Sequence, residues 1–157
     1  MKTIYRKTLF WATIAIVPIG ISIFTLSAFN PTNVAETSSE HKDEKLRTRR
    51  YNFSGDLSAM KKAIEEAIPT LKTSIWGGNW RVVVKGLEDE NDELKVIKAE
   101  IPVVMFTDDM RIELKRDNEE VIVNVRSNSR TGKSDLGENR RHILQILEKL
   151  DEEFSRI

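Results

Sequence analysis

Hydrophobic and polar residues alternate along four segments in the second half of the chain. In the third segment, Met110, Ile112 and Leu114 alternate with Arg111 and other charged residues. A period of two predicts strands that have one apolar and one solvated face. The connecting segments are too short for crossover helices, so an antiparallel meander is expected. The four predicted strands lie within residues 79–87, 93–104, 108–116 and 119–127.

Apolar residues at spacings of three and four predict a helix before the strands. Asp56 is its expected N-cap, and Pro69 is expected to end or bend it. The predicted buried stripe consists of Leu57, Met60, Ile64, Ile68 and Leu71.

A second helix is expected at the C-terminus, with Asp135 as N-cap and Glu138 three residues later. Its stripe consists of Leu136, Ile143, Leu147, Leu150 and Phe154. Two helices with one apolar face each fit one apolar sheet face. Residues 51–157 therefore predict an α+β two-layer sandwich: a four-stranded antiparallel meander with both helices packed on one face.

The N-terminal part of the chain predicts a membrane anchor ahead of this domain. Residues 8–29 carry no charge, and 22 residues of helix span about 33 Å. Lys2, Arg6 and Lys7 precede this segment, which places residues 1–7 in the cytoplasm and the domain outside the inner (plasma) membrane, as a single-pass protein. A cleaved signal peptide remains the alternative, since Leu26-Ser27-Ala28 ends the run with small residues.

Composition limits the function of the exported part. Residues 30–50 are polar and lack an apolar period, which predicts a disordered tether. From residue 30 onward, 22 basic residues face 25 acidic ones, so nucleic acid is not an expected partner. The chain has no cysteine, which excludes disulfides and cysteine-type zinc sites. No metal or cofactor is expected.

Residues 126–141 are the stretch most suggestive of a binding site, with five basic and two acidic residues. Residues 131–134, TGKS, match the end of a phosphate-binding loop, but Ser127 stands where that loop needs glycine. The strand before it also belongs to an antiparallel meander. A nucleotide loop is therefore not expected.

A two-residue hairpin turn at Asp117-Asn118 would place Asp109 opposite Arg126 and Asp108 opposite Ser127. This register predicts an ionic cluster where sheet, loop and helix meet. Its members are Asp108, Asp109, Arg126, Asp135 and Arg140, with Arg130 beside them.

Two interpretations of these charges stay open. In one, the charges satisfy each other and only fix the angle between strand and helix. In the other, Arg130, Lys133 and Arg141 bind an anion near a helix N-terminus. No catalytic residue is assigned, because His142 has no visible triad partners and a surface or packing role is expected for it.

The same residues resemble domain of unknown function family 1499. The resemblance rests on a phenylalanine and paired aspartates before a strand, followed by an Arg-Ser-x-Ser-Arg-x-Gly-x-Ser-Asp-x-Gly-x-Asn-Arg signature. It implies an uncharacterised, often exported or membrane-associated bacterial or plastid protein, and assigns no reaction. The Asn-Cys-x-Ser segment of many members is absent. The matching positions are Phe106, Asp108, Asp109, Arg126, Ser127, Ser129, Arg130, Gly132, Ser134, Asp135, Gly137, Asn139 and Arg140.

Two function classes follow. The first is a membrane-tethered extracytoplasmic binding or accessory module that recognises an anionic lipid, polymer or acidic protein through residues 126–141. The second is an envelope enzyme acting on an anionic substrate. A concave site joining Asp108, Ser129 and Lys133 would favour the enzyme.

Overall fold

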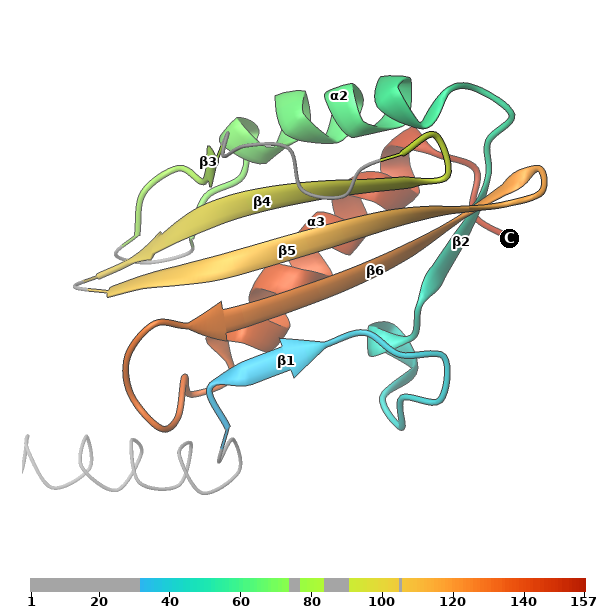
Figure 1. Cartoon of the computed structure of the whole chain (residues 1–157). Helices are drawn as coiled ribbons and strands as arrows, with labels where there is room; N and C mark the ends of the chain where they lie inside the picture. The colour runs from blue at the N-terminus through green and yellow to red at the C-terminus, as the bar shows by residue number, and fades with distance from the viewer. Residues whose placement is uncertain (1–31, 74–76, 84–90, 105) are drawn as a thin grey trace, which may run out of the picture.

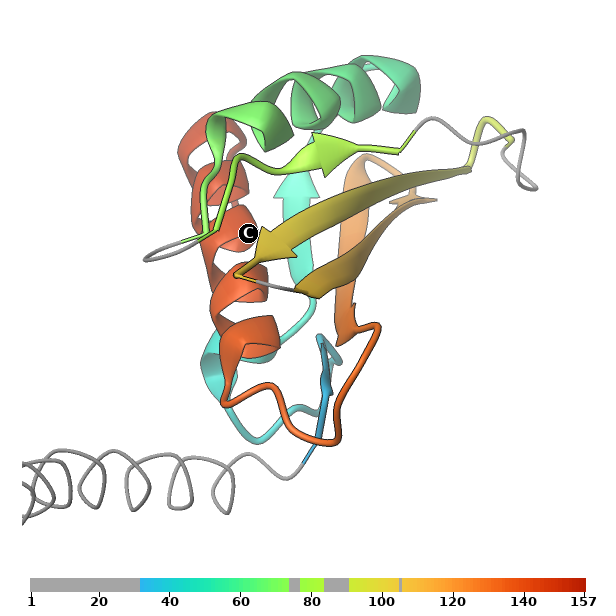
Figure 2. The same cartoon turned by 90° about the vertical axis from the view of Figure 1, so that its left-hand side faces the viewer.

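The computed structural model describes residues 32–73, 77–83, 91–104 and 106–157, and consists of one antiparallel sheet with two helices on one of its faces (Figures 1 and 2). The N-terminal elements are β1 (Val34–Glu36), the 3-10 turn η1 (Glu44–Leu46) and β2 (Arg49–Asn52). The elements that follow are α2 (Leu57–Ala67), the 3-10 turn η2 (Ile68–Thr70), β3 (Arg81–Val82), β4 (Leu94–Val103), β5 (Phe106–Asp117), β6 (Glu120–Ser129) and α3 (Glu138–Glu153).

The sheet has six strands, so the prediction of four is wrong. Strands β3 to β6 are the predicted meander, and β1 and β2 both pair with the free edge of β6. Ala35 lies opposite Ser127, and Tyr51 lies opposite Val121. Residues 34–36 and 49–50, which the sequence placed in a disordered tether, are therefore part of the sheet.

A few buried side chains order this N-terminal stretch. Tyr51 and Leu46 belong to the hydrophobic core. Arg49 is buried as well, with its Nε 3.4 Å from Asp151 Oδ2 and its Nη1 donating to the carbonyl of Arg47. The sequence RRYN looks polar, but it supplies one aromatic core residue and one paired buried cation.

The hairpin between β5 and β6 turns one residue later than expected. Asp117 pairs with Glu120, so Asn118 and Glu119 form the turn, and Asn118 adopts a positive φ of 58°. Asparagine tolerates this conformation better than most residues. The predicted register is therefore wrong by two residues, but a shift of two keeps every side chain on its predicted face.

The predicted core is largely confirmed. The expected stripe of α2 is buried, and the Asp56 carboxylate caps the helix by accepting from Ser58 N at 3.0 Å. The inward residues of β4, β5 and β6 join the same hydrophobic cluster as both helices. The opposite face of the sheet is charged and only partly buried.

The last helix begins later than the sequence predicts. Its N-cap is Gly137, with φ 85°, and α3 starts at Glu138. Leu136 has φ 55° and lies before the helix instead of on its buried stripe. Ile143, Leu147 and Leu150 are buried as expected.

The predicted transmembrane helix falls on residues 8–29, which lie outside the described residues. Within the described ranges, no helix has the length and apolar character needed to cross a membrane.

Candidate functional site

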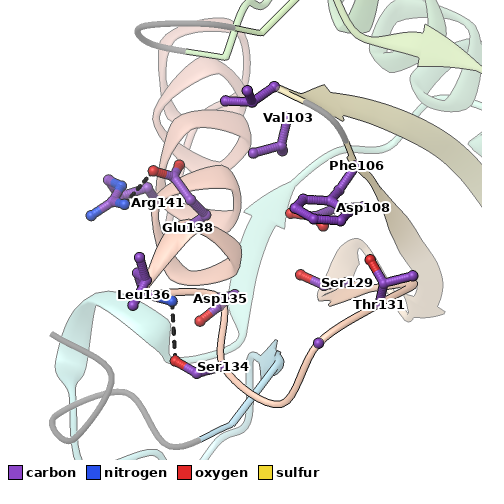
Figure 3. A pocket seen from close by; sticks show the side chains of 12 residues that line it. Val103, Phe106, Asp108, Ser129, Thr131, Ser134, Asp135, Leu136, Glu138 and Arg141 are labelled. Carbon is purple, nitrogen blue, oxygen red and sulfur yellow. Dashed lines mark hydrogen bonds and ion pairs between the residues drawn. The ribbon is translucent and has the colours of Figure 1, made fainter. Parts of the chain in front are cut away.

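A cavity of about 710 Å³ lies at the end of the sheet where β4 finishes, β5 starts and β6 leads into α3 (Figure 3). Figure 3 shows side chains from these elements and from the loop between β6 and α3 gathered around it. The lining residues are Val103, Val104, Phe106, Asp108, Ser129, Thr131, Gly132, Ser134, Asp135, Leu136, Glu138 and Arg141.

Strand register brings the strand residues of the cavity together. Val103 pairs with Phe106 across the β4–β5 hairpin, and Asp108 pairs with Ser129 between β5 and β6. Phe106 and Asp108 are two residues apart on one strand and so point to the same face. The site therefore combines apolar side chains near the hairpin with polar ones further along the strands.

Asp108 is the buried acid of the site, with 2 % of its surface exposed. Burial raises its pKa, because a carboxylate loses hydration, and the neighbouring acids Asp135 and Glu138 act in the same direction. A hydrogen bond with Ser129 opposes this change. A carboxyl group with a raised pKa in a cavity is typical of binding and catalytic sites.

His142 of α3 packs beside Asp108 and is equally buried, with 2 % of its surface exposed. Its Nδ1 is 3.5 Å from Asp108 Oδ2, and its Nε2 is 3.7 Å from Glu138 Oε2. Neither ring nitrogen has a hydrogen-bond partner among the described residues. Burial lowers the pKa of His142 to about 4, so the ring is neutral at pH 7 and these contacts are not ion pairs there.

The ring of His142 also packs edge-on against Trp80, with centroids 5.6 Å apart. This contact agrees with the packing role expected for His142. Its approach to Asp108 could not be predicted from the sequence, because 34 positions separate the two residues along the chain.

Asn139 links the first turn of α3 to the end of the sheet and is fully buried. Its Oδ1 accepts a 2.6 Å hydrogen bond from Ser127 Oγ, and its Nδ2 donates to Ser129 Oγ at 3.1 Å. Nδ2 also reaches the carbonyl of Asn33 at 2.9 Å. These bonds fix the helix start against β6 and so hold one wall of the cavity.

The loop before α3 is held by Asp135. Its carboxylate accepts from Gly137 N at 2.9 Å and from Asn139 N at 2.7 Å. Asp135 therefore stabilises the helix start, although it is not the N-cap residue itself. Gly132 takes a φ of 92°, in the region that favours glycine.

The structure separates the charges that the sequence placed in one cluster. Arg130 Nη2 lies 2.6 Å from Asp109 Oδ1 and 2.5 Å from Glu100 Oε1, on the outer face of the sheet. The remaining pairs join Arg126 to Glu36 at 3.3 Å and Arg140 to Asp43 at 2.6 Å. Asp109 lies opposite Asn128, so the expected Asp109–Arg126 pairing is wrong.

The three anion-binding candidates are also separated. Arg130 is engaged on the outer face, and Arg141 pairs with Glu138 at the cavity. Lys133 is exposed on the loop and is not among the residues that line the cavity. Among the lining residues, Asp108, Asp135 and Glu138 outnumber the single cation Arg141.

No group of three or more histidine, aspartate or glutamate side chains in the described ranges is arranged to hold a metal ion. The absence of a cofactor remains a prediction from the sequence.

The fold and the cavity together define a small sheet-and-helix domain with a ligand-sized pocket at one end. The family model described as Protein of unknown function (DUF1499) matches residues 25–150, so the chain belongs to this family. No curated protein and no solved structure matches the chain. The signature positions that line the pocket are Phe106, Asp108, Ser129, Gly132, Ser134 and Asp135.

Proposed function

We propose that the domain is a binding module whose pocket takes a small amphiphile with an apolar body and a cationic or hydrogen-bond-donating head. The observation that carries this proposal is the buried Asp108 at a cavity of about 710 Å³. This volume lies within the usual range of small-molecule sites, about 300 to 1,000 Å³.

The two parts of the ligand follow from the lining. Val103, Phe106 and Leu136 supply apolar surface, which favours a hydrocarbon body. Asp108 and Ser129 supply oxygen atoms that accept hydrogen bonds. The proposal keeps the class of binding module expected from the sequence, but the excess of acidic lining residues favours a cationic head over an anionic one.

Hexylamine and hexanoate test this choice of charge, because they share one chain length and carry opposite charges. We expect the purified protein to bind hexylamine more tightly, as measured by calorimetry or by NMR shifts. Asp108→Asn should weaken hexylamine binding about tenfold, equivalent to about 1.4 kcal/mol.

Asp109→Asn is the matched control, since it removes the adjacent carboxylate on the outer face and should leave hexylamine binding unchanged. Equal or tighter binding of hexanoate would contradict the proposal. So would equal losses of hexylamine binding in the two variants.

An enzyme remains the second candidate, because the raised pKa of Asp108 suits an acid or base that exchanges protons in a cavity. A serine–lysine pair has no support from the lining, which includes Ser129 but not Lys133. Conversion of a bound amphiphile to product would favour the enzyme over the module, if Asp108→Asn abolishes the conversion while the unreacted amphiphile still binds.

We also propose that residues 8–29 hold the domain at the inner membrane, with residues 32–157 on the extracytoplasmic side. The uncharged segment and the preceding basic residues support this location. A reporter fused after Ile157 tests which side of the membrane the domain occupies. Activity of a cytoplasm-only reporter there would contradict the proposed topology.

A further inference from the structure

The end of the domain that carries the pocket also exposes large apolar side chains. Among the described residues, Val104 is 67 % exposed and Phe106 is 53 % exposed, and both line the pocket. Ile157 is 64 % exposed but lies at the opposite end, where its backbone N–H bonds the carbonyl of Arg50. Two exposed apolar residues at one pocket opening are a candidate contact surface.

The helices cover this end of the sheet as far as Asp108, but leave Val104 and Phe106 at the β4–β5 hairpin exposed. Asn139, in the first turn of α3, contacts Ser127 and Ser129. Phe106 lies further toward the hairpin, on the face that α3 covers elsewhere, and stays half exposed. Val104 also adopts a φ of 40°, which is uncommon for a β-branched residue and holds its side chain at the hairpin tip.

The chain enters the domain at the same end. The carbonyl of Asn33 accepts from Ser129 N at 2.9 Å, and the carbonyl of Thr32 accepts from Asp135 N at 3.4 Å. Asn33 Nδ2 also donates to the carbonyl of Gly132 at 3.0 Å. Thr32 and Asn33 are therefore bonded directly to the loop that lines the pocket.

Chain length then limits how far the pocket can lie from a membrane. The uncharged segment ends at Phe29, three residues before Thr32. Three residues span at most about 11 Å. A bilayer that holds residues 8–29 therefore lies within about that distance of Thr32 and of the loop bonded to it.

We infer that Val104 and Phe106 contact the lipid surface, so that the pocket opens toward the bilayer and takes its amphiphile from it. This inference rests on the proposed pocket function and membrane location, and it names the source of the ligand. Aliphatic and aromatic side chains at the headgroup boundary are typical of interfacial contacts. Exposed Lys133 on the same loop suits an anionic headgroup region.

Single-cysteine labelling tests the contact, because the natural chain has no cysteine. Val104→Cys, Phe106→Cys and Ile157→Cys each receive an environment-sensitive fluorophore in the full-length chain, reconstituted in vesicles of phosphatidylcholine and phosphatidylglycerol. Ile157 is the matched control, because it is as exposed as Val104 but lies at the other end. We expect blue-shifted emission at positions 104 and 106, with several-fold stronger quenching by doxyl-labelled lipid than at position 157.

Equal quenching at the three positions would overturn the inference, because it would show no preferred orientation. Blue-shifted emission without lipid quenching at 104 and 106 would also overturn it, since protein would then cover the surface. The pocket proposal is judged separately, by the Asp108-dependent binding of hexylamine. Binding without lipid contact at 104 and 106 would leave the pocket function standing and remove only the membrane source.

Discussion

On the outer face of the sheet, Asp109 and Glu100 hold Arg130 between them, and all three side chains remain partly open to solvent. One residue earlier on β5, Asp108 points to the inner face, where it is buried beside the neutral ring of His142. The outer carboxylates have a permanent cationic partner. The inner carboxyl group has a serine hydroxyl and a neutral imidazole near it.

This difference separates structural charge from candidate functional charge. Ion pairs between exposed side chains contribute little to stability, because water screens them. A buried carboxyl group without a cation has a raised pKa and keeps the capacity to bind a cation or a proton from a ligand. Asp108 belongs to this second kind because α3 buries it beside His142 without placing a cationic side chain against it.

The largest expected effect concerns the buried imidazole. His142 has an ordinary pKa near 6.5 and a folded-state pKa of about 4. The unfolded chain therefore takes up a proton between these values while the folded one does not, so stability is lost as pH falls through this window. Between pH 7 and pH 4, the wild type should lose about 3 kcal/mol more than His142→Gln.

Urea unfolding at several pH values measures this difference. Protonation of Asp108 changes stability in the opposite direction. Because its pKa is raised in the folded state, the folded state gains stability as this carboxyl group is protonated at low pH. Asp108, Asp135, Glu138 and Arg141 are present in both proteins, so the comparison isolates the imidazole. Parallel pH profiles would show that His142 is hydrated in solution.

The second prediction compares an asparagine of α3 that packs on the inner face of the sheet with an asparagine of β6 on the outer face. Asn139→Ala should cost about 2 kcal/mol, because it leaves the buried Ser127 hydroxyl without its acceptor and removes one of the two hydrogen bonds to the Asn33 carbonyl. Asn128→Ala, on the outer face, should stay within about 0.5 kcal/mol. Denaturant unfolding measures both, and similar costs would contradict the difference between the faces.

The sequence predicted the parts of the fold that depend on periodicity. The stripe of α2 and the alternation along β4, β5 and β6 were sufficient to predict these elements, because each buried face needs apolar residues at a fixed spacing. Strands β1 and β2 were missed because they are short, and pairing along an edge needs few apolar side chains. Tyr51 is the one residue of RRYN in the hydrophobic core.

The candidate site was harder to predict, because its partners depend on register and on long-range contacts. Choosing the turn at Asp117-Asn118 put Asp108 opposite Ser127, whereas the observed turn puts it opposite Ser129. Arg140 forms an ion pair with Asp43, which lies in the segment predicted to be a disordered tether. The alternation of the strand did place Asp108 and Asp109 on opposite faces, which is the feature that defines the site.

The third prediction addresses the outer face directly. Arg130→Ala and Asp109→Ala should each cost at most about 1 kcal/mol, and the double variant should lose less than their sum because the two side chains interact. The losses of unfolding free energy caused by Asp109→Ala and Arg126→Ala should be additive, since Arg126 pairs with Glu36 instead. Thermodynamic coupling between Asp109 and Arg126 in urea unfolding would contradict the observed register.

The smallest expected effect is that of Lys133→Ala, which should change stability by no more than about 0.5 kcal/mol. Lys133 is exposed on the loop before α3, where Asp135 and Gly137, not the lysine, determine the backbone conformation. The same substitution should reduce association with vesicles that contain phosphatidylglycerol, while leaving hexylamine binding intact, because the side chain does not line the pocket. Unfolding of the domain on loss of Lys133 would instead show that this charge is structural, like the ion pairs on the outer face of the sheet.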